Sequence, residues 1–133
     1  MKYMLLMQFS AAKAEFPIIT EWAESEVQAH IDFMRETNAK LVADGEFVEA
    51  QGLAFPEAAK IVRAGHDGAP LVTEGPFPET KEFLAGYWIV DCETEQRAVE
   101  IAAHASSAPG PGGKPLNMPI EVRQVMFAPP TEL

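Results

Sequence analysis

The sequence predicts an α+β domain with a ferredoxin-like βαββαβ order, in which an antiparallel sheet carries two helices on one face. Short apolar runs typical of strands and two longer segments with helical apolar spacing follow one another in that order. Right-handed crossovers then place both helices on the same face of the sheet. The 133 residues, 47% of them hydrophobic, are enough for one core, so residues 1–133 are expected to form a single domain.

The N-terminal third reads as a strand followed by a long helix. Residues 2–9 (KYMLLMQF) are apolar on both alternating faces, which indicates a strand covered on both sides. A helix is expected from Thr20, a candidate N-cap, to Gly45, a typical C-terminal stop. Its apolar stripe consists of Ala23, Val27, Met34 and Leu41.

The middle of the chain favours short strands and turns. Residues 47–53 and 60–63 read as strands on either side of the turn AFPEA, which predicts a hairpin between them. Residues 71–82 (LVTEGPFPETKE) are rich in turn-forming residues and are expected to be irregular.

The last third repeats the pattern of strand, helix and strand. Residues 83–90 (FLAGYWIV) are apolar on both faces, which is typical of a central strand. Thr94 is a candidate cap for a helix that ends before Pro109, and a connector rich in proline and glycine follows it. Residues 120–127 alternate cleanly and predict the final strand.

Charge and cysteine content limit the partners and the compartment. A net charge of −10 repels nucleic acid phosphates and anionic lipids, so neither nucleic acid nor membrane is an expected partner. The single cysteine, Cys92, cannot form an internal disulfide, and the N-terminal apolar run is too short to span a bilayer and lacks a signal-peptide cleavage site. These features predict a cytoplasmic protein.

Two helices can cover only one face of a sheet whose strands are apolar on both sides. The remaining apolar face would be a large exposed patch on a monomer. We therefore expect a homodimer that packs through the sheet face, with two-fold symmetry.

His30 is the first candidate for a chemical role. It lies in the apolar stripe between Val27 and Met34, so its imidazole is expected to point toward the sheet. A neutral imidazole in such a place can act as a general base. The alternative is a core histidine that makes one hydrogen bond and has no further function.

Carboxylates near the Gly-Pro turn form the second group of candidates. Glu74 could orient His30 or transfer a proton itself, whereas Glu79, Lys81 and Glu82 are either ligand contacts or a solvated charged run before a strand.

Two strand residues and two histidines are the remaining candidates for a binding role. Tyr87 and Arg123 are candidates for binding an anionic or aromatic ligand, although a strand tyrosine is more often core and a strand arginine a salt-bridge partner. His66 and His104 have no metal-binding partner at short spacing, so no metal site is expected. The sequence also lacks a phosphate-binding loop and a nucleophile elbow, and we expect no cofactor.

The segments EGPFPETKEFLAGYWIVD (74–91), AHIDFM in the first helix and GPGGKPLNMPIEVRQVMF near the C-terminus together resemble the YCII-related family, in its DGPF-motif branch. Glu74 stands where that branch is named for aspartate, so the carboxylate is one methylene longer. The resemblance implies a dimeric α+β barrel of ferredoxin-like type.

The resemblance leaves several functions open. A His-carboxylate pair is proposed for some relatives, at least one relative is a dehalogenating lyase-type enzyme, and others are encoded beside or fused to sigma factors. This chain is therefore expected either to bind a small molecule, with His30 and Glu74 as an acid/base pair, or to be a non-catalytic module that works with a sigma factor. A third alternative is a barrel retained for structure alone.

Overall fold

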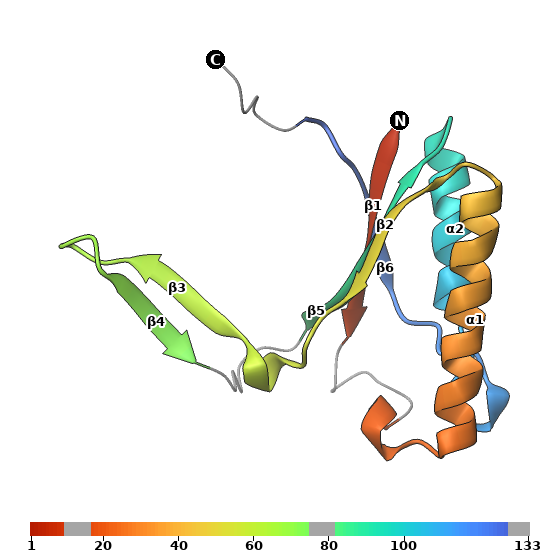
Figure 1. Cartoon of the computed structure of the whole chain (residues 1–133), viewed down its shortest axis with the longest axis horizontal. Helices are drawn as coiled ribbons and strands as arrows, with labels where there is room; N and C mark the ends of the chain where they lie inside the picture. Colours follow the sequence, from red (N-terminus) through yellow and green to blue (C-terminus); the bar gives the residue numbers. More distant parts are fainter. Residues whose placement is uncertain (10–16, 75–81, 128–133) are drawn as a thin grey trace.

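The strands build one four-stranded antiparallel sheet and a separate two-stranded hairpin (Figure 1). The computed structural model describes residues 1–9, 17–74 and 82–127. The elements follow in the order β1 (Lys2–Phe9), η1 (Ile19–Glu21), α1 (Glu24–Ala43), β2 (Phe47–Gly52), η2 (Pro56–Ala58), β3 (Lys60–Ala64), β4 (Pro70–Glu74), β5 (Phe83–Asp91), α2 (Glu95–Ser106), η3 (Pro111–Gly113) and β6 (Ile120–Gln124).

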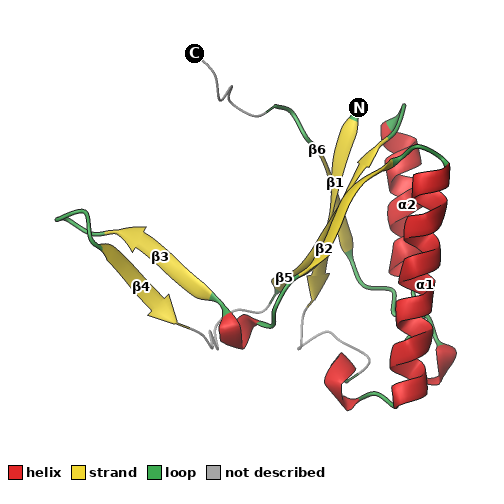
Figure 2. Ribbon diagram, in the orientation of Figure 1, coloured by secondary structure: helices red, strands yellow, loops and turns green. Residues whose placement is uncertain are grey.

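The main sheet has the strand order β2-β5-β1-β6, and both helices lie on one of its faces (Figures 1 and 2). This order is that of a ferredoxin-like fold, so the predicted α+β class is confirmed. β5 pairs with β1 on one side and with β2 on the other, which makes it a central strand as its apolar pattern predicts. Along β5, Gly86, Trp88 and Val90 are buried toward the helices, whereas the residues between them are half-buried on the opposite face.

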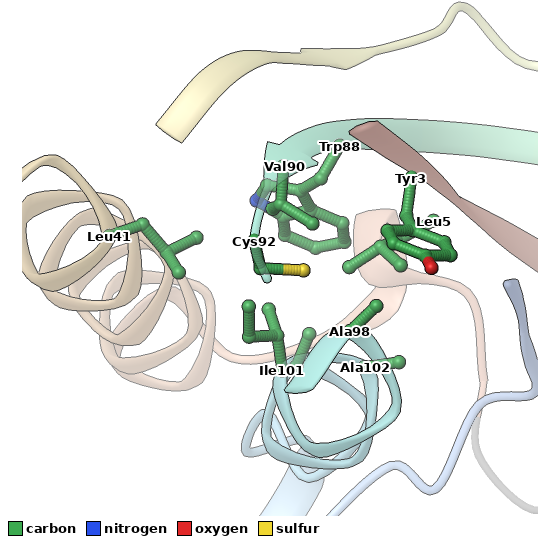
Figure 3. Close-up of a cluster of buried hydrophobic side chains, with 10 residues drawn as sticks. Tyr3, Leu5, Leu41, Trp88, Val90, Cys92, Ala98, Ile101 and Ala102 are labelled. Atoms are coloured by element: carbon green, nitrogen blue, oxygen red, sulfur yellow. The ribbon is translucent and has the colours of Figure 1, made fainter. Parts of the chain in front are cut away.

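The core lies between the sheet and the helices (Figure 3). Leu5 and Val90, from neighbouring strands, are fully buried, and Ala98, Ile101 and Ala102 of α2 pack against that cluster. The small alanines let α2 approach the sheet closely. At the edge of this core, Trp88 donates its indole N–H to the Asn38 side chain of α1 at 2.9 Å, which satisfies a polar group that burial would otherwise leave unpaired.

The predicted N-terminal cap is correct for α2 and wrong for α1. Thr94 caps α2 as predicted, because its hydroxyl accepts the backbone N–H of Arg97 at 3.1 Å. The predicted start of α1 at Thr20 is wrong, since residues 19–21 form a short 3-10 turn and α1 begins at Glu24. There the side chain of Glu26 accepts the backbone N–H of Ala23 at 2.9 Å.

The middle strands pair differently from the expectation. β2 joins the main sheet beside β5, and β3 forms its hairpin with β4, so the expected hairpin across the AFPEA turn is wrong. The expected irregularity of residues 71–82 is also wrong for its first part, because β4 reaches Glu74. The hairpin projects from the sheet on the side away from the helices (Figure 2). The final strand ends at Gln124, three residues before the predicted end.

Candidate functional site

A cavity of about 510 Å³ lies at the end of the sheet where β1 ends and β5 begins. Its wall comes from the end of β1, residues 17–22, the first half of α1, the residues after β2, the start of β5 and the connector before β6. Most of the lining side chains are apolar, among them Phe9, Trp22, Met34, Leu53, Phe55 and Phe83. A volume of this size is typical of small-molecule sites, which span about 300–1,000 Å³.

Besides Trp22, whose indole N–H donates to the Pro17 carbonyl, four polar residues line this apolar wall, namely Gln8, His30, Glu82 and Asn117. A second, much smaller void of about 10 Å³ adjoins the same region and is also lined by His30. The His30 ring is therefore bordered by open space and is not enclosed on all sides. Few polar groups in an apolar pocket are the usual means by which a site orients its ligand.

His30 is held from two sides. Its Nδ1 lies 3.1 Å from the backbone oxygen of Pro109, and its ring meets that of Trp22 edge to face at a centroid distance of 5.5 Å. A carbonyl oxygen can only accept a hydrogen bond, so Nδ1 carries the hydrogen. In the neutral ring Nε2 is then the proton acceptor, and no other hydrogen bond of His30 occurs in the described part of the chain.

The connector that supplies the Pro109 carbonyl is itself anchored to α1. The carboxylate of Glu26 accepts the backbone N–H of Gly112 at 2.6 Å, as well as that of Ala23. These two hydrogen bonds, that of Gly112 foremost, lower the pKa of Glu26. Gly112 has a φ of 69°, a conformation that favours glycine, so the connector can turn back toward the helix at this point.

An irregularity in the sheet brings neighbouring residues of β1 to the cavity. Met7 pairs with Gly86, but the next residue, Gln8, pairs with Leu84, so Ala85 is an extra residue on β5. Such a bulge changes the direction of side chains at a strand end. Met7, Gln8 and Ala85 all line the cavity as a result.

Glu74, the predicted partner of His30, is not brought to the cavity. It ends β4 in the projecting hairpin, its side chain is 71% exposed, and its carboxylate lies 3.9 Å from the ammonium of Lys60. The orienting contact expected from Glu74 comes instead from the Pro109 carbonyl.

The remaining predicted ligand contacts are divided among different places. Glu79 and Lys81 lie outside the described residues. Tyr87 and Arg123 do not line the cavity; they belong to the sheet face opposite the helices, where the Tyr87 hydroxyl donates to Glu49 at 3.0 Å. This hydrogen bond, together with burial, raises the pKa of Tyr87.

Sequence reasoning missed most of the polar lining. Glu82 was weighed as part of a charged run, yet it is the glutamate that the described structure places in the cavity wall together with His30. Gln8 could not be recognised without the bulge, and Asn117 lies in the connector. The unusual feature of Asn117 is its backbone, whose φ of 54° is uncommon for a residue other than glycine.

The described residues contain no cluster of three or more histidine, cysteine or acidic side chains placed to hold a metal ion. Neither of their helices is long and apolar enough to cross a membrane. His104 contributes to packing between the helices, where its ring stacks on Phe33 and its Nε2 lies 3.2 Å from the Thr37 hydroxyl oxygen.

Comparison with known proteins identifies the family of the chain. The family model described as YCII-related domain matches residues 1–109, a range that includes His30, Glu82 and all the strands of the main sheet except β6. The chain belongs to the YCII-related family. An uncharacterised protein of Rhizobium meliloti (strain 1021) is 28% identical over 116 residues, which cover 87% of this chain and 89% of that protein.

The matched YCII-related region ends at Pro109, the residue whose carbonyl binds His30. The cavity of this family member is therefore built partly within the matched region and partly by the connector beyond it, which includes Leu116, Asn117 and Met118.

Proposed function

We propose that this YCII-related protein binds a small, largely apolar molecule in the cavity at the sheet end and that His30 exchanges a proton with it. The observation that carries the proposal is the arrangement of the imidazole, whose Nδ1–H is held by a backbone carbonyl while the ring borders a cavity of about 510 Å³. A histidine oriented in this way presents Nε2 as the base without needing a carboxylate behind it.

The reaction class that fits best is proton abstraction followed by elimination, of the lyase or dehalogenase type. Nε2 of His30 takes a proton from carbon, the C–H electron pair forms a new double bond, and a leaving group departs with its own bonding electrons. Glu82 is the second polar group proposed to act in the same cavity, in the place first assigned to Glu74. A mostly apolar wall that includes Phe9, Trp22, Phe55 and Phe83 suits an aromatic or carbonyl compound.

The finer family assignment is part of the same proposal. The segment 74–91 supports membership of the DGPF-motif branch, although the first residue of that motif is Glu74 in this chain.

The experiment compares His30→Gln with His104→Gln. A glutamine at position 30 keeps a side-chain N–H that can donate to the Pro109 carbonyl but lacks a basic ring nitrogen. His104 serves as the matched control because it is the other helix histidine and does not line the cavity. Binding is measured with the apolar fluorescent probe N-phenyl-1-naphthylamine. Turnover is measured by NMR as hydrogen–deuterium exchange at carbon, and as halide release, over a panel of aryl ketones and halogenated carbonyl compounds.

We expect both variants to bind the probe and only His30→Gln to lose exchange or release, by about a hundredfold or more. Equal turnover in His30→Gln and the wild-type protein would refute the role of His30. A protein that binds no probe, retains no small molecule and instead captures a sigma factor would favour the non-catalytic alternative and overturn the proposal.

A further inference from the structure

The connector between α2 and β6 folds into a tight turn at residues 110–114, which we call the η3 turn. At its base, the backbone N–H of Gly110 donates to the carbonyl of Lys114 at 2.7 Å. Pro109 and Pro115, on either side of the turn, form an isolated β-bridge. Because these contacts close its base, the η3 turn is expected to move as one unit.

The η3 turn contacts α1 at two points. At its tip, the backbone N–H of Gly112 donates to Oε2 of Glu26 at 2.6 Å. At its base, the Pro109 carbonyl accepts a hydrogen bond from Nδ1 of His30 at 3.1 Å. Residues four positions apart lie on the same face of an α-helix, so Glu26 and His30 both reach the same turn. One helix therefore holds the tip of the turn and receives the carbonyl at its base.

The part of the connector that lines the cavity is anchored to a different helix. Leu116 and Asn117 donate their backbone N–H groups, both at 2.9 Å, to carbonyls at or just after the end of α2. The Ser106 hydroxyl of α2 donates to the carbonyl of Met118 at 2.7 Å. Loss of the contact at Glu26 should therefore release the η3 turn and leave this part of the cavity wall in place.

The position of the Pro109 carbonyl decides which nitrogen of His30 is basic. The tautomer of a neutral imidazole is set by the hydrogen bond that one of its two nitrogens makes. While Nδ1–H donates to the carbonyl, Nε2 has a free lone pair and can accept a proton. When the carbonyl moves away, the ring can adopt the Nε2–H tautomer, in which Nε2 is a donor and no longer a base.

We propose that Glu26 is a positioning residue for His30, because its carboxylate holds the η3 turn, keeps the Pro109 carbonyl on Nδ1 and so selects the tautomer with a basic Nε2. The other oxygen of this carboxylate accepts the backbone N–H of Ala23 at 2.9 Å, which fixes the side chain in place to receive the turn. The consequence for turnover rests on the function proposed above for His30, whereas the selection of the tautomer does not.

The test is the tautomer ratio of the His30 ring, measured by two-bond 1H–15N correlation NMR at a pH well above the ordinary histidine range. The spectrum of His30→Gln provides the assignment. Glu26→Ala removes the acceptor of the Gly112 N–H. Gly112→Ala weakens the same contact from the other side, because its φ of 69° is strained for alanine although an added Cβ would meet nothing within 4 Å.

Each variant has a matched control away from the η3 turn. Glu24→Ala removes another acid from the first turn of α1, one that makes no hydrogen bond or ion pair among the described residues. Gly45→Ala introduces a similar strain, since Gly45 has a φ of 73° and open space around an added Cβ, but it lies beyond the other end of α1. Circular dichroism and thermal unfolding establish that each variant is folded.

We expect the ratio of the Nδ1–H to the Nε2–H tautomer to fall by about two- to tenfold in Glu26→Ala and Gly112→Ala, as the net contribution of one hydrogen bond allows. The ratio should stay at the wild-type value in both controls. Turnover of the compound panel should fall only as far as the fraction of the Nδ1–H tautomer falls.

A wild-type ratio in Glu26→Ala would show that the base of the turn holds the carbonyl by itself, and would overturn the proposal. An equal fall of the ratio in the two controls would overturn it as well, because the effect would then be general. Turnover that does not respond to His30→Gln, together with a lowered ratio in Glu26→Ala, would refute the proposed function and still support the positioning role of Glu26.

Discussion

Replacing Gly86 with alanine is expected to destabilise the fold, whereas the same change at Gly52, its partner across the β2–β5 pair, is not. A Cβ at Gly86 would lie 2.8 Å from the backbone oxygen of Gln51 and 3.3 Å from the Cα of Gly52. The first distance is about 0.6 Å shorter than the 3.4 Å at which ordinary van der Waals contact begins. Both neighbours are backbone atoms that no side-chain rotation can move, so β2 must shift away from β5.

Overpacking of this kind costs about 1–3 kcal/mol. A Cβ at Gly52 meets nothing within 4 Å. Gly52→Ala should be neutral or stabilise the protein by up to about 1 kcal/mol through the unfolded state. Urea unfolding followed by tryptophan fluorescence, at equal protein concentrations, measures both variants. The reasoning would be refuted if Gly86→Ala were as stable as Gly52→Ala.

Three further predictions concern groups outside the cavity wall. The pKa of Glu26 is lowered in the fold, so its contribution to the free energy of unfolding is complete above the ordinary glutamate range and is lost as the pH falls through the lowered value. The free energy of unfolding of Glu26→Gln should therefore fall less steeply with acid than that of the wild-type protein, and an unchanged pH profile would contradict this. Burial raises the pKa of the Cys92 thiol, so iodoacetamide should modify it far more slowly in the native protein than in urea, and comparable rates would show that the site opens. Leu5→Ala should cost about 2–5 kcal/mol in urea unfolding because Leu5 is fully buried, whereas the exposed Val42→Ala should stay within about 0.5 kcal/mol; a similar loss in both would argue against the core position of Leu5.

The elements that sequence reasoning predicted correctly depend on neighbours along the chain. The apolar residues on both alternating faces of residues 83–90 predicted a central strand, and the structure buries Gly86, Trp88 and Val90 on one of those faces. The Thr94 cap is equally local, since it is a bond to a residue three positions away. The inward direction of His30 followed from its position in the helical stripe.

The errors arose where competing arrangements have similar local patterns. Thr20 is a good cap by residue type, yet the 3-10 turn at residues 19–21 comes before the helix and Glu26 provides a capping bond at Ala23. The residues of β2 suit a hairpin partner as well as a sheet neighbour. Which of the two they adopt depends on β5, whose Tyr87 is 38 positions from its contact Glu49.

Sequence alone determined the α+β class, the order of the four main-sheet strands and the two helices, and the facing of His30, because these follow from residue spacing and from the handedness of short connections. The tertiary structure decided what surrounds that imidazole. The Pro109 carbonyl that binds it is 79 positions away along the chain. The bulge opposite Met7 and Gln8 arises from pairing with a distant strand, and Glu74 lies in a separate hairpin. Contacts between residues so far apart leave no periodic pattern in the chain, so only the packed fold shows which groups share the cavity.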